Sequence, residues 1–94
     1  MKTIYKYPLE ITDTQTIRIP KGAKILTVQF QRTMIAIWAE VDLEATMEGR
    51  LIRIFGTGHK IPDDLELLYI GTVQMHEGQL IWHVYEEIKR RNKC

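Results

Sequence analysis

The sequence predicts an all-β fold, a single small antiparallel sandwich or partly open barrel of about seven strands. Apolar and polar residues alternate with a period of two along most of the chain, and no long segment shows helical spacing. The candidate strands are short, follow one another at intervals of about 8 to 12 residues, and are separated by turn-forming residues. A length of 94 residues leaves room for one domain.

Four strands are expected in the N-terminal half, at residues 4–7, 14–19, 24–31 and 34–41. The first is expected to be an edge strand that Pro8 closes. In the second, Ile17 and Ile19 share one face. A short turn at residues 32–33 predicts that the third and fourth form a hairpin.

The alternation also predicts which side chains of this hairpin face inward. In the first strand of the hairpin, the apolar face is expected to hold Leu26, Val28 and Phe30. In the second it is expected to hold Ile35, Ile37, Ala39 and Val41. Trp38 falls on the opposite, less apolar face, where a ligand or a second subunit could reach it.

Three strands are expected in the C-terminal half, at residues 50–55, 67–75 and 80–85. The acidic segment 42–49 is expected to be a loop or at most one helical turn. Gly71 interrupts its strand, which indicates a β-bulge or a close backbone approach. Residues 76–79 are expected to form a hairpin loop.

Charge divides the chain into a β domain, residues 1–87, and a basic C-terminal tail, residues 88–94. The domain carries nine basic and twelve acidic residues, the tail adds four basic ones, and the formal net charge is +1. This balance does not favour a nucleic-acid binder. The tail is either a solvated end or an arm for phosphate or acidic partners.

Composition also bears on where in the cell the protein is located and on whether it forms oligomers. The single cysteine, Cys94, excludes an intramolecular disulfide and a cysteine zinc cluster. No apolar run approaches the roughly 20 residues of a membrane helix, and residues 1–8 lack the apolar core of a signal peptide. We therefore expect a cytoplasmic protein with no membrane association. Because a core this small gives limited stability, we expect the protein to form a homo-oligomer.

The segment Gly56-Thr57-Gly58-His59-Lys60 is the most suggestive candidate site. Two glycines allow close backbone approach, and consecutive amides can form an anion-binding nest. The hydroxyl, imidazole and ammonium groups that follow would suit a phosphate. The alternative is a turn that ends a strand, needs a positive φ and leaves His59 exposed to solvent.

Aromatic and basic side chains on the strands extend this candidate. Arg53 would add positive charge, and Trp38, Tyr69 or Trp82 would stack a base. The alternative is that these rings supply core or interface area.

Catalysis and metal binding find no support in the sequence. The chain contains no serine, and Cys94 is terminal, so neither offers a positioned nucleophile. The three histidines lack the spacing that favours a metal site, and His83 is expected to be a packed or hydrogen-bonded sheet residue. We therefore expect a protein that is not an enzyme and has no cofactor or metal.

Six segments together resemble a known family: KYPL, GAKIL, IWAEVD, GTGHKIP, YIGTVQ and WHVYE, at residues 6–9, 22–26, 37–42, 56–62, 69–74 and 82–86. In this order they resemble an uncharacterised family of small proteins encoded by phages, prophages and bacteria. The resemblance spans about residues 4–86 and implies no established activity. By association it favours a non-enzymatic phage accessory or counter-defence protein. Such a protein would sequester a nucleotide second messenger or, alternatively, block a host protein.

Overall fold

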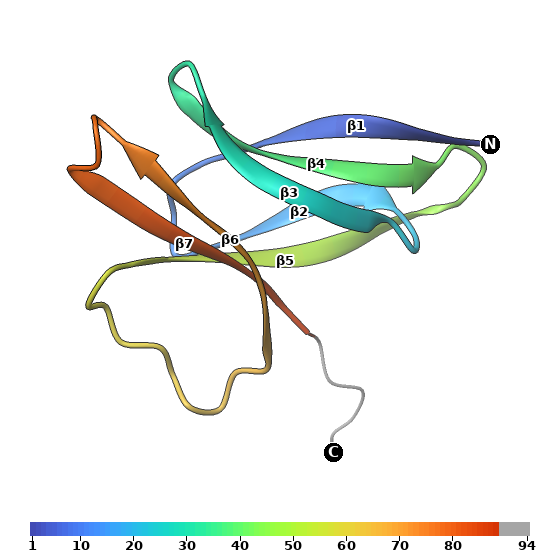
Figure 1. Cartoon of the computed structure of the whole chain (residues 1–94). Helices are drawn as coiled ribbons and strands as arrows, with labels where there is room; N and C mark the ends of the chain where they lie inside the picture. Colours follow the sequence, from blue (N-terminus) through green and yellow to red (C-terminus); the bar gives the residue numbers. More distant parts are fainter. Residues whose placement is uncertain (89–94) are drawn as a thin grey trace.

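The computed structural model describes residues 1–88, which form seven antiparallel strands in two sheets (Figure 1). The strands are β1 (Lys2–Leu9), β2 (Thr14–Pro20), β3 (Lys24–Gln31), β4 (Met34–Asp42), β5 (Met47–Gly56), β6 (Leu67–Met75) and β7 (Leu80–Glu87). One sheet has the order β1-β4-β3 and the other β2-β5-β7-β6. No helix occurs within residues 1–88, so the predicted all-β sandwich is confirmed.

The two sheets pack face to face and are not closed into a barrel (Figure 1). The smallest extent of the molecule is 16 Å, as expected for two sheets about 10 Å apart. Both sheets contribute to the largest fully buried side chains, Ile19, Ile35, Ile37, Val41, Ile52 and Val84. Burial of this apolar set is the main favourable term in folding.

Pro8 does not close the first strand, as the sequence had suggested. It lies within β1 opposite Ala36, and the strand continues to Leu9. The strand pairs only with β4, so the prediction of an edge strand is confirmed. An edge strand tolerates proline because its outward N–H groups have no partner strand to lose.

A bulge in β3 makes the predicted inward face of the hairpin wrong at Leu26. The register with β4 shifts between Ile25 and Thr27, leaving Leu26 out of step. Ile25 packs against the core, whereas Leu26 is 43% exposed. One extra residue moves every side chain on one side of the bulge to the opposite face. Val28, beyond the bulge, faces inward as predicted.

The bulge predicted at Gly71 is confirmed, because the register of β6 with β7 shifts between Tyr69 and Gly71. The backbone here comes close to the other sheet. A Cβ added to Gly71 would lie 2.7 Å from Cγ1 of Val28 in β3. Strands β3 and β6 therefore meet across the sandwich at this point without joining one sheet.

The remaining differences concern the ends of elements. Residues 43–46 form a turn rather than helix, and β5 begins earlier than predicted, at Met47. Strand β7 runs two residues further, to Glu87. The predicted basic tail lies almost wholly outside the described residues. Within those residues, no helix has the length and apolar character needed to cross a membrane.

Candidate functional site

Strand β5 ends at Gly56, which pairs with Trp82 of β7. The chain then turns, with the His59 N–H donating to the Gly56 carbonyl oxygen at 3.0 Å. Gly58 has a φ of 89°, which glycine adopts without the steric cost that other residues meet. The predicted turn with a positive φ is therefore confirmed. It places Thr57 and His59 directly beyond the end of the sheet.

The imidazole of His59 lies over the backbone of Gly56. Its Nδ1 accepts a hydrogen bond from the Gly56 N–H at 3.2 Å. A Cβ on residue 56 would lie 2.9 Å from Cε1 of the ring, so glycine is needed for this close approach. The ring thus occupies one of the amides that the sequence had offered to a phosphate. In this conformation the Gly56 amide is not available to an anion.

A cavity of about 270 Å³ lies on one side of His59. Its lining residues are Gly56, Thr57, His59, Gln79, Leu80, Ile81 and Trp82, and we call it the Trp82 cavity. Nε1 of Trp82 is the one buried side-chain nitrogen or oxygen within residues 1–88 that lacks a hydrogen-bond partner. A buried donor without an acceptor is costly and uncommon in folded proteins. The cavity therefore has an apolar wall, and one of its lining residues carries an unsatisfied N–H donor that is buried in this conformation.

A second cavity, of about 290 Å³, is also lined by His59. Its lining residues are Asp13, Arg53, Ile54, Phe55, His59, Lys60 and Pro62, and we call it the Lys60 cavity. Nε of Arg53 donates to Oε1 of Glu87 at 2.9 Å, so much of its charge is already neutralised. Lys60 is exposed and has no ion-pair partner among residues 1–88. Lys60 is thus the cation of this cavity that is open to a ligand.

A chain of hydrogen bonds leads from this corner across the outer side of the four-stranded sheet. Thr57 Oγ1 lies 2.8 Å from Nε2 of His83, and Thr72 Oγ1 lies 3.0 Å from Nδ1 of the same ring. The Tyr69 hydroxyl makes a short hydrogen bond to Thr72. The prediction of a hydrogen-bonded sheet histidine is confirmed. Because hydroxyl groups both donate and accept, either neutral tautomer of His83 can be satisfied.

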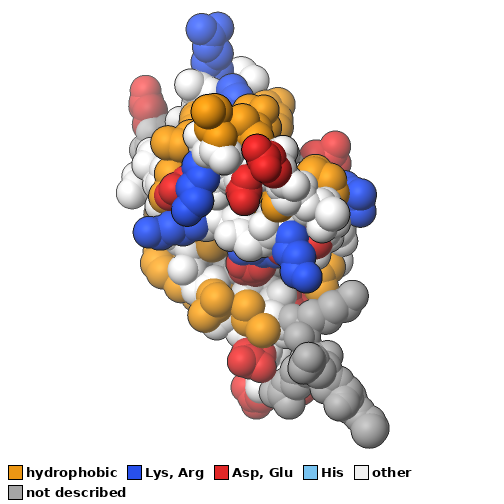
Figure 2. Space-filling view, turned by 90° about the vertical axis from the view of Figure 1, so that its right-hand side faces the viewer, with side chains coloured by type: hydrophobic (Ala, Val, Ile, Leu, Met, Phe, Trp, Pro, Cys, Tyr) orange, Lys and Arg blue, Asp and Glu red, His pale blue; other side chains and the backbone are white. Residues whose placement is uncertain are grey.

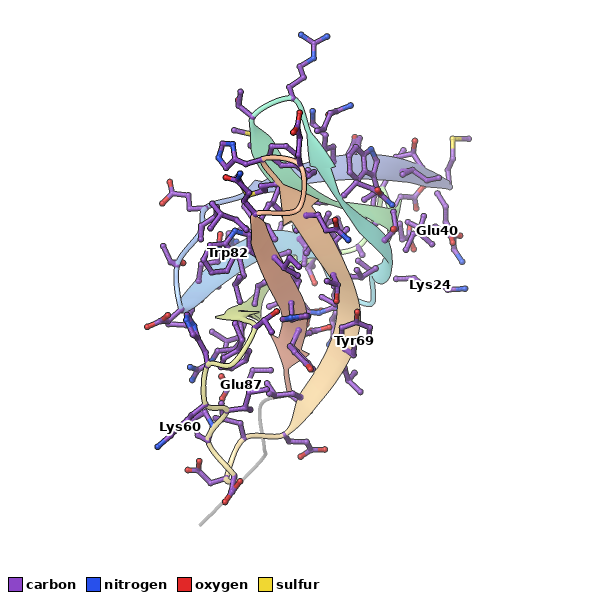
Figure 3. All side chains as sticks on the ribbon, turned by 60° about the vertical axis from the view of Figure 1, so that its left-hand side comes forward. Lys24, Glu40, Lys60, Tyr69, Trp82 and Glu87 are labelled. Carbon is purple, nitrogen blue, oxygen red and sulfur yellow. The ribbon has the colours of Figure 1, made fainter. Side chains whose placement is uncertain are left out.

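The structure brings most of the predicted site residues together, but not all. Those that line one or both cavities are Arg53, Gly56, Thr57, His59, Lys60 and Trp82. Gly58 shapes the turn without lining either cavity. In Figure 3 the labelled Trp82, Glu87 and Lys60 all lie toward the left of the view.

Two of the predicted aromatic residues lie elsewhere. Trp38 belongs to β4 in the three-stranded sheet, on the side opposite the buried Ile37 and Ala39. Tyr69 is 60% exposed and lines a groove between β3 and β6, with an edge-to-face contact to Tyr85. Neither ring can stack on a ligand held in the Trp82 cavity without a large rearrangement.

Sequence reasoning missed the acidic members of the site, Asp13 and Glu87. Asp13 lies in a connection between strands, where no periodic pattern predicts position. Glu87 could have been found, because continued alternation from His83 and Tyr85 places it on the same face as Arg53 of the neighbouring strand. The expected cationic site is therefore of mixed charge.

Larger hollows of about 410 and 420 Å³ flank a buried ion pair between Arg50 and Glu86. The polar groups of this pair already satisfy one another, and the exposed Lys24 is the one cation lining these hollows that has no ion-pair partner among residues 1–88. Residues 1–88 contain no group of three or more His, Cys, Asp or Glu side chains placed to hold a metal ion. The corner around His59 therefore remains the candidate site because of its chemistry rather than its size.

Fold and site together define a small antiparallel β-sandwich with two adjoining cavities at one corner. The family described as "Domain of unknown function (DUF7352)" matches residues 1–93, and the chain belongs to this family. The expectation of an uncharacterised family is confirmed, and the match extends beyond residue 86, where the resemblance ended. Comparison with curated proteins gives no match, and comparison with solved structures gives none.

Proposed function

We propose that this protein is a non-enzymatic binder that sequesters a small anionic ligand of the nucleotide second-messenger class. In this proposal it acts as a phage accessory protein that counters host defence, in the host cytosol. The ligand would occupy the corner around His59. A stoichiometric binder needs affinity and shape rather than reacting groups.

The observation that carries the proposal is the unpartnered Nε1 of Trp82 at a cavity beside Lys60 and His59. Because this N–H is buried in the structure, a neighbouring side chain would have to move before an acceptor on the ligand could reach it and remove the cost of leaving the donor unpaired. The apolar wall of the same cavity would suit a flat ring. Lys60 would attract the negative charge of a phosphate.

The surface charge supports a compact ligand rather than a long nucleic acid. On the one face that Figure 2 presents, the right-hand side of Figure 1, basic and acidic side chains are interspersed, and residues 1–87 carry nine basic against twelve acidic residues. A nucleic-acid surface needs clustered Lys and Arg side chains along the backbone path. A single cation next to a cavity that could hold a flat ring suits a ligand with one or two phosphates.

A thermal-shift screen against cyclic dinucleotides and ADP-ribose derivatives tests the proposal. A ligand present at 100 times its Kd stabilises the folded state by about 2.7 kcal/mol, which moves the midpoint by several degrees for a domain of this size. No shift with any compound at millimolar concentration would overturn the proposal. Native mass spectrometry of the purified protein would show a retained ligand and the expected homo-oligomer in one measurement.

One observation favours a second candidate, a protein-interaction module that blocks a host protein. Three exposed apolar side chains, Leu26, Leu68 and Tyr69, line the groove between the edge strands β3 and β6. Exposed apolar clusters on edge strands are typical of partner-binding surfaces. The substitution Leu68→Lys should abolish such an interaction while leaving ligand binding at the His59 corner unchanged.

A further inference from the structure

His59 lines both cavities of the candidate site. The Trp82 cavity and the Lys60 cavity have no other lining residue in common. His59 is therefore the residue at which a cavity with an apolar wall and a cavity with a free cation meet. Its position depends on one hydrogen bond, from the Gly56 N–H to Nδ1.

We infer that the two cavities are halves of one nucleotide site and that His59 must swing aside to join them. This inference rests on the proposed function and deepens it by assigning a role to each half. The Trp82 cavity takes the base, and Nε1, which is buried in this conformation, donates to an acceptor on the ring once the site has opened. The Lys60 cavity takes the phosphate, because Lys60 supplies a cation that has no ion-pair partner among residues 1–88.

Cavity size supports a shared site. Pockets that hold small molecules have volumes of about 300 to 1,000 Å³. The two cavities measure about 270 and 290 Å³, so each falls just below that range while the joined space enters it. A single cavity accommodates a base or a phosphate, whereas a molecule that carries both needs His59 to move.

The His59 side chain is held weakly enough to move. His59 is exposed and lies in the connection between β5 and β6, so its ring can leave without opening the core. Its departure would free the Gly56 amide as a further donor. The hydrogen bond that is lost is a neutral one, which contributes only about 0.5 to 1.5 kcal/mol net.

The electrostatics of the Lys60 cavity define the charge that the ligand can carry there. Asp13 lies in this cavity with Arg53, and Glu87 pairs with Arg53. Asp13 and Glu87 together balance Arg53 and Lys60, so the formal charges of these four groups sum to zero. The structure thus favours one phosphate group in this half over a triphosphate, whose additional charge would face Asp13.

The experiment measures binding of adenosine 5′-monophosphate, adenosine and inorganic phosphate to the whole chain by isothermal titration calorimetry. The monophosphate should bind at least tenfold more tightly than either fragment, because it alone fills both halves. The substitution His59→Ala removes the imidazole and should tighten binding of the monophosphate by roughly three- to tenfold, the equivalent of one neutral hydrogen bond. Binding of adenosine should depend on Trp82 and binding of phosphate on Lys60.

Two further variants separate the role of His59 from general effects on the protein. His76→Ala is the matched control, because His76 is also an exposed histidine in a turn, lies between β6 and β7, and lines neither cavity. It should leave all affinities unchanged. His59→Asn retains a short acceptor for the Gly56 N–H without the ring and should give an intermediate affinity. Without ligand, hydrogen exchange of the Gly56 amide with solvent should be faster in His59→Ala than in the wild type.

Each failure has a distinct meaning. If the monophosphate binds but His59→Ala leaves its affinity unchanged or weaker, or if adenosine binds as tightly as the monophosphate, the shared site is wrong and ligand binding stands. If the messenger screen gives a ligand while the monophosphate binds to no variant, the shared site is again wrong. If nothing in either panel binds, the proposed function falls as well.

Discussion

The guanidinium of Arg50 and the carboxylate of Glu86 form a bidentate ion pair between the neighbouring strands β5 and β7 of the four-stranded sheet. Nε of Arg50 donates to Oε2 at 2.5 Å and Nη2 donates to Oε1 at 3.0 Å. Nη1 also donates to the carbonyl oxygen of Ala23 at 3.0 Å, which connects β5 to the turn before β3. Hydrogen bonding to Glu86 raises the pKa of Arg50 above its ordinary value, although burial acts in the opposite direction. The pair therefore joins two strands of one sheet, and the contact with Ala23 connects that sheet to the turn before β3.

Glu86→Ala should destabilise the protein because it leaves the Arg50 charge partly buried with its main partner removed. The side chains of Arg50 and Glu86 are 18% and 11% exposed, so some water reaches the pair. We expect a loss of about 2–3 kcal/mol in the free energy of unfolding, below the roughly 3–5 kcal/mol for a fully buried pair. Urea denaturation measures the change.

Glu87→Ala is the matched control for this prediction. Glu87 pairs with Arg53 on the outer face of the same sheet, where the two side chains are 21% and 24% exposed. Partly exposed pairs of this kind contribute about 0–1 kcal/mol. An equal loss in both variants would show that the inward position of Glu86 has no special effect.

Gly71→Ala should destabilise the contact between the sheets. The new Cβ would lie 2.7 Å from Cγ1 of Val28, so one of the two strands must shift. Overpacking of this kind costs about 1–3 kcal/mol. In the Val28→Ala background the same substitution should cost less, and thermal unfolding of the four proteins of this cycle measures the difference. Additive losses would mean that the two residues do not oppose one another in solution.

The alternation of apolar and polar residues was enough to predict the strands, their inward faces and the hairpins wherever the pairing between strands is regular. It failed at Leu26, because a bulge adds one residue to β3 and nothing in the local composition marks it. The bulge in β6 was predictable because Gly71 stands in an otherwise apolar strand. Sheet order was not accessible, because pairing depends on contacts between distant parts of the chain.

The sequence predicted which segment forms the candidate site, but it did not predict how the side chains of that segment are arranged. Two glycines followed by His59 and Lys60 indicated a turn with donors, and the structure contains that turn. The hydrogen bond that the ring accepts from Gly56 was not predictable, because it depends on side-chain direction within an irregular connection. The separation of Trp38 from the corner follows from sheet order, which the sequence leaves open.

Trp82→Phe should separate stability from binding. The substitution removes a buried N–H that has no partner, which offsets part of the apolar area lost with the indole. We expect the free energy of unfolding to change by no more than about 1 kcal/mol, while affinity for a bound nucleotide falls roughly fivefold with the lost donor. Chemical denaturation and calorimetry measure the two effects.

Trp38→Phe provides the comparison for this variant, because Trp38 lies on the other sheet. It should leave nucleotide affinity unchanged. If Trp38→Phe and Trp82→Phe reduce affinity equally, the ligand does not sit in the Trp82 cavity.

The two glycines of the corner should respond to alanine for different reasons. Gly58→Ala places a side chain at a φ of 89°, which should cost about 1–2 kcal/mol of stability although open space surrounds the new Cβ. Gly56→Ala instead brings its Cβ within 2.9 Å of the His59 ring and should push the ring from its place. The Gly56→Ala variant should therefore reproduce the ligand affinity of His59→Ala, whereas Gly58→Ala should bind like the wild type once folded. Thermal unfolding and calorimetry of both variants test this pairing, and a tighter-binding Gly58→Ala would show that affinity follows loop strain rather than the position of His59.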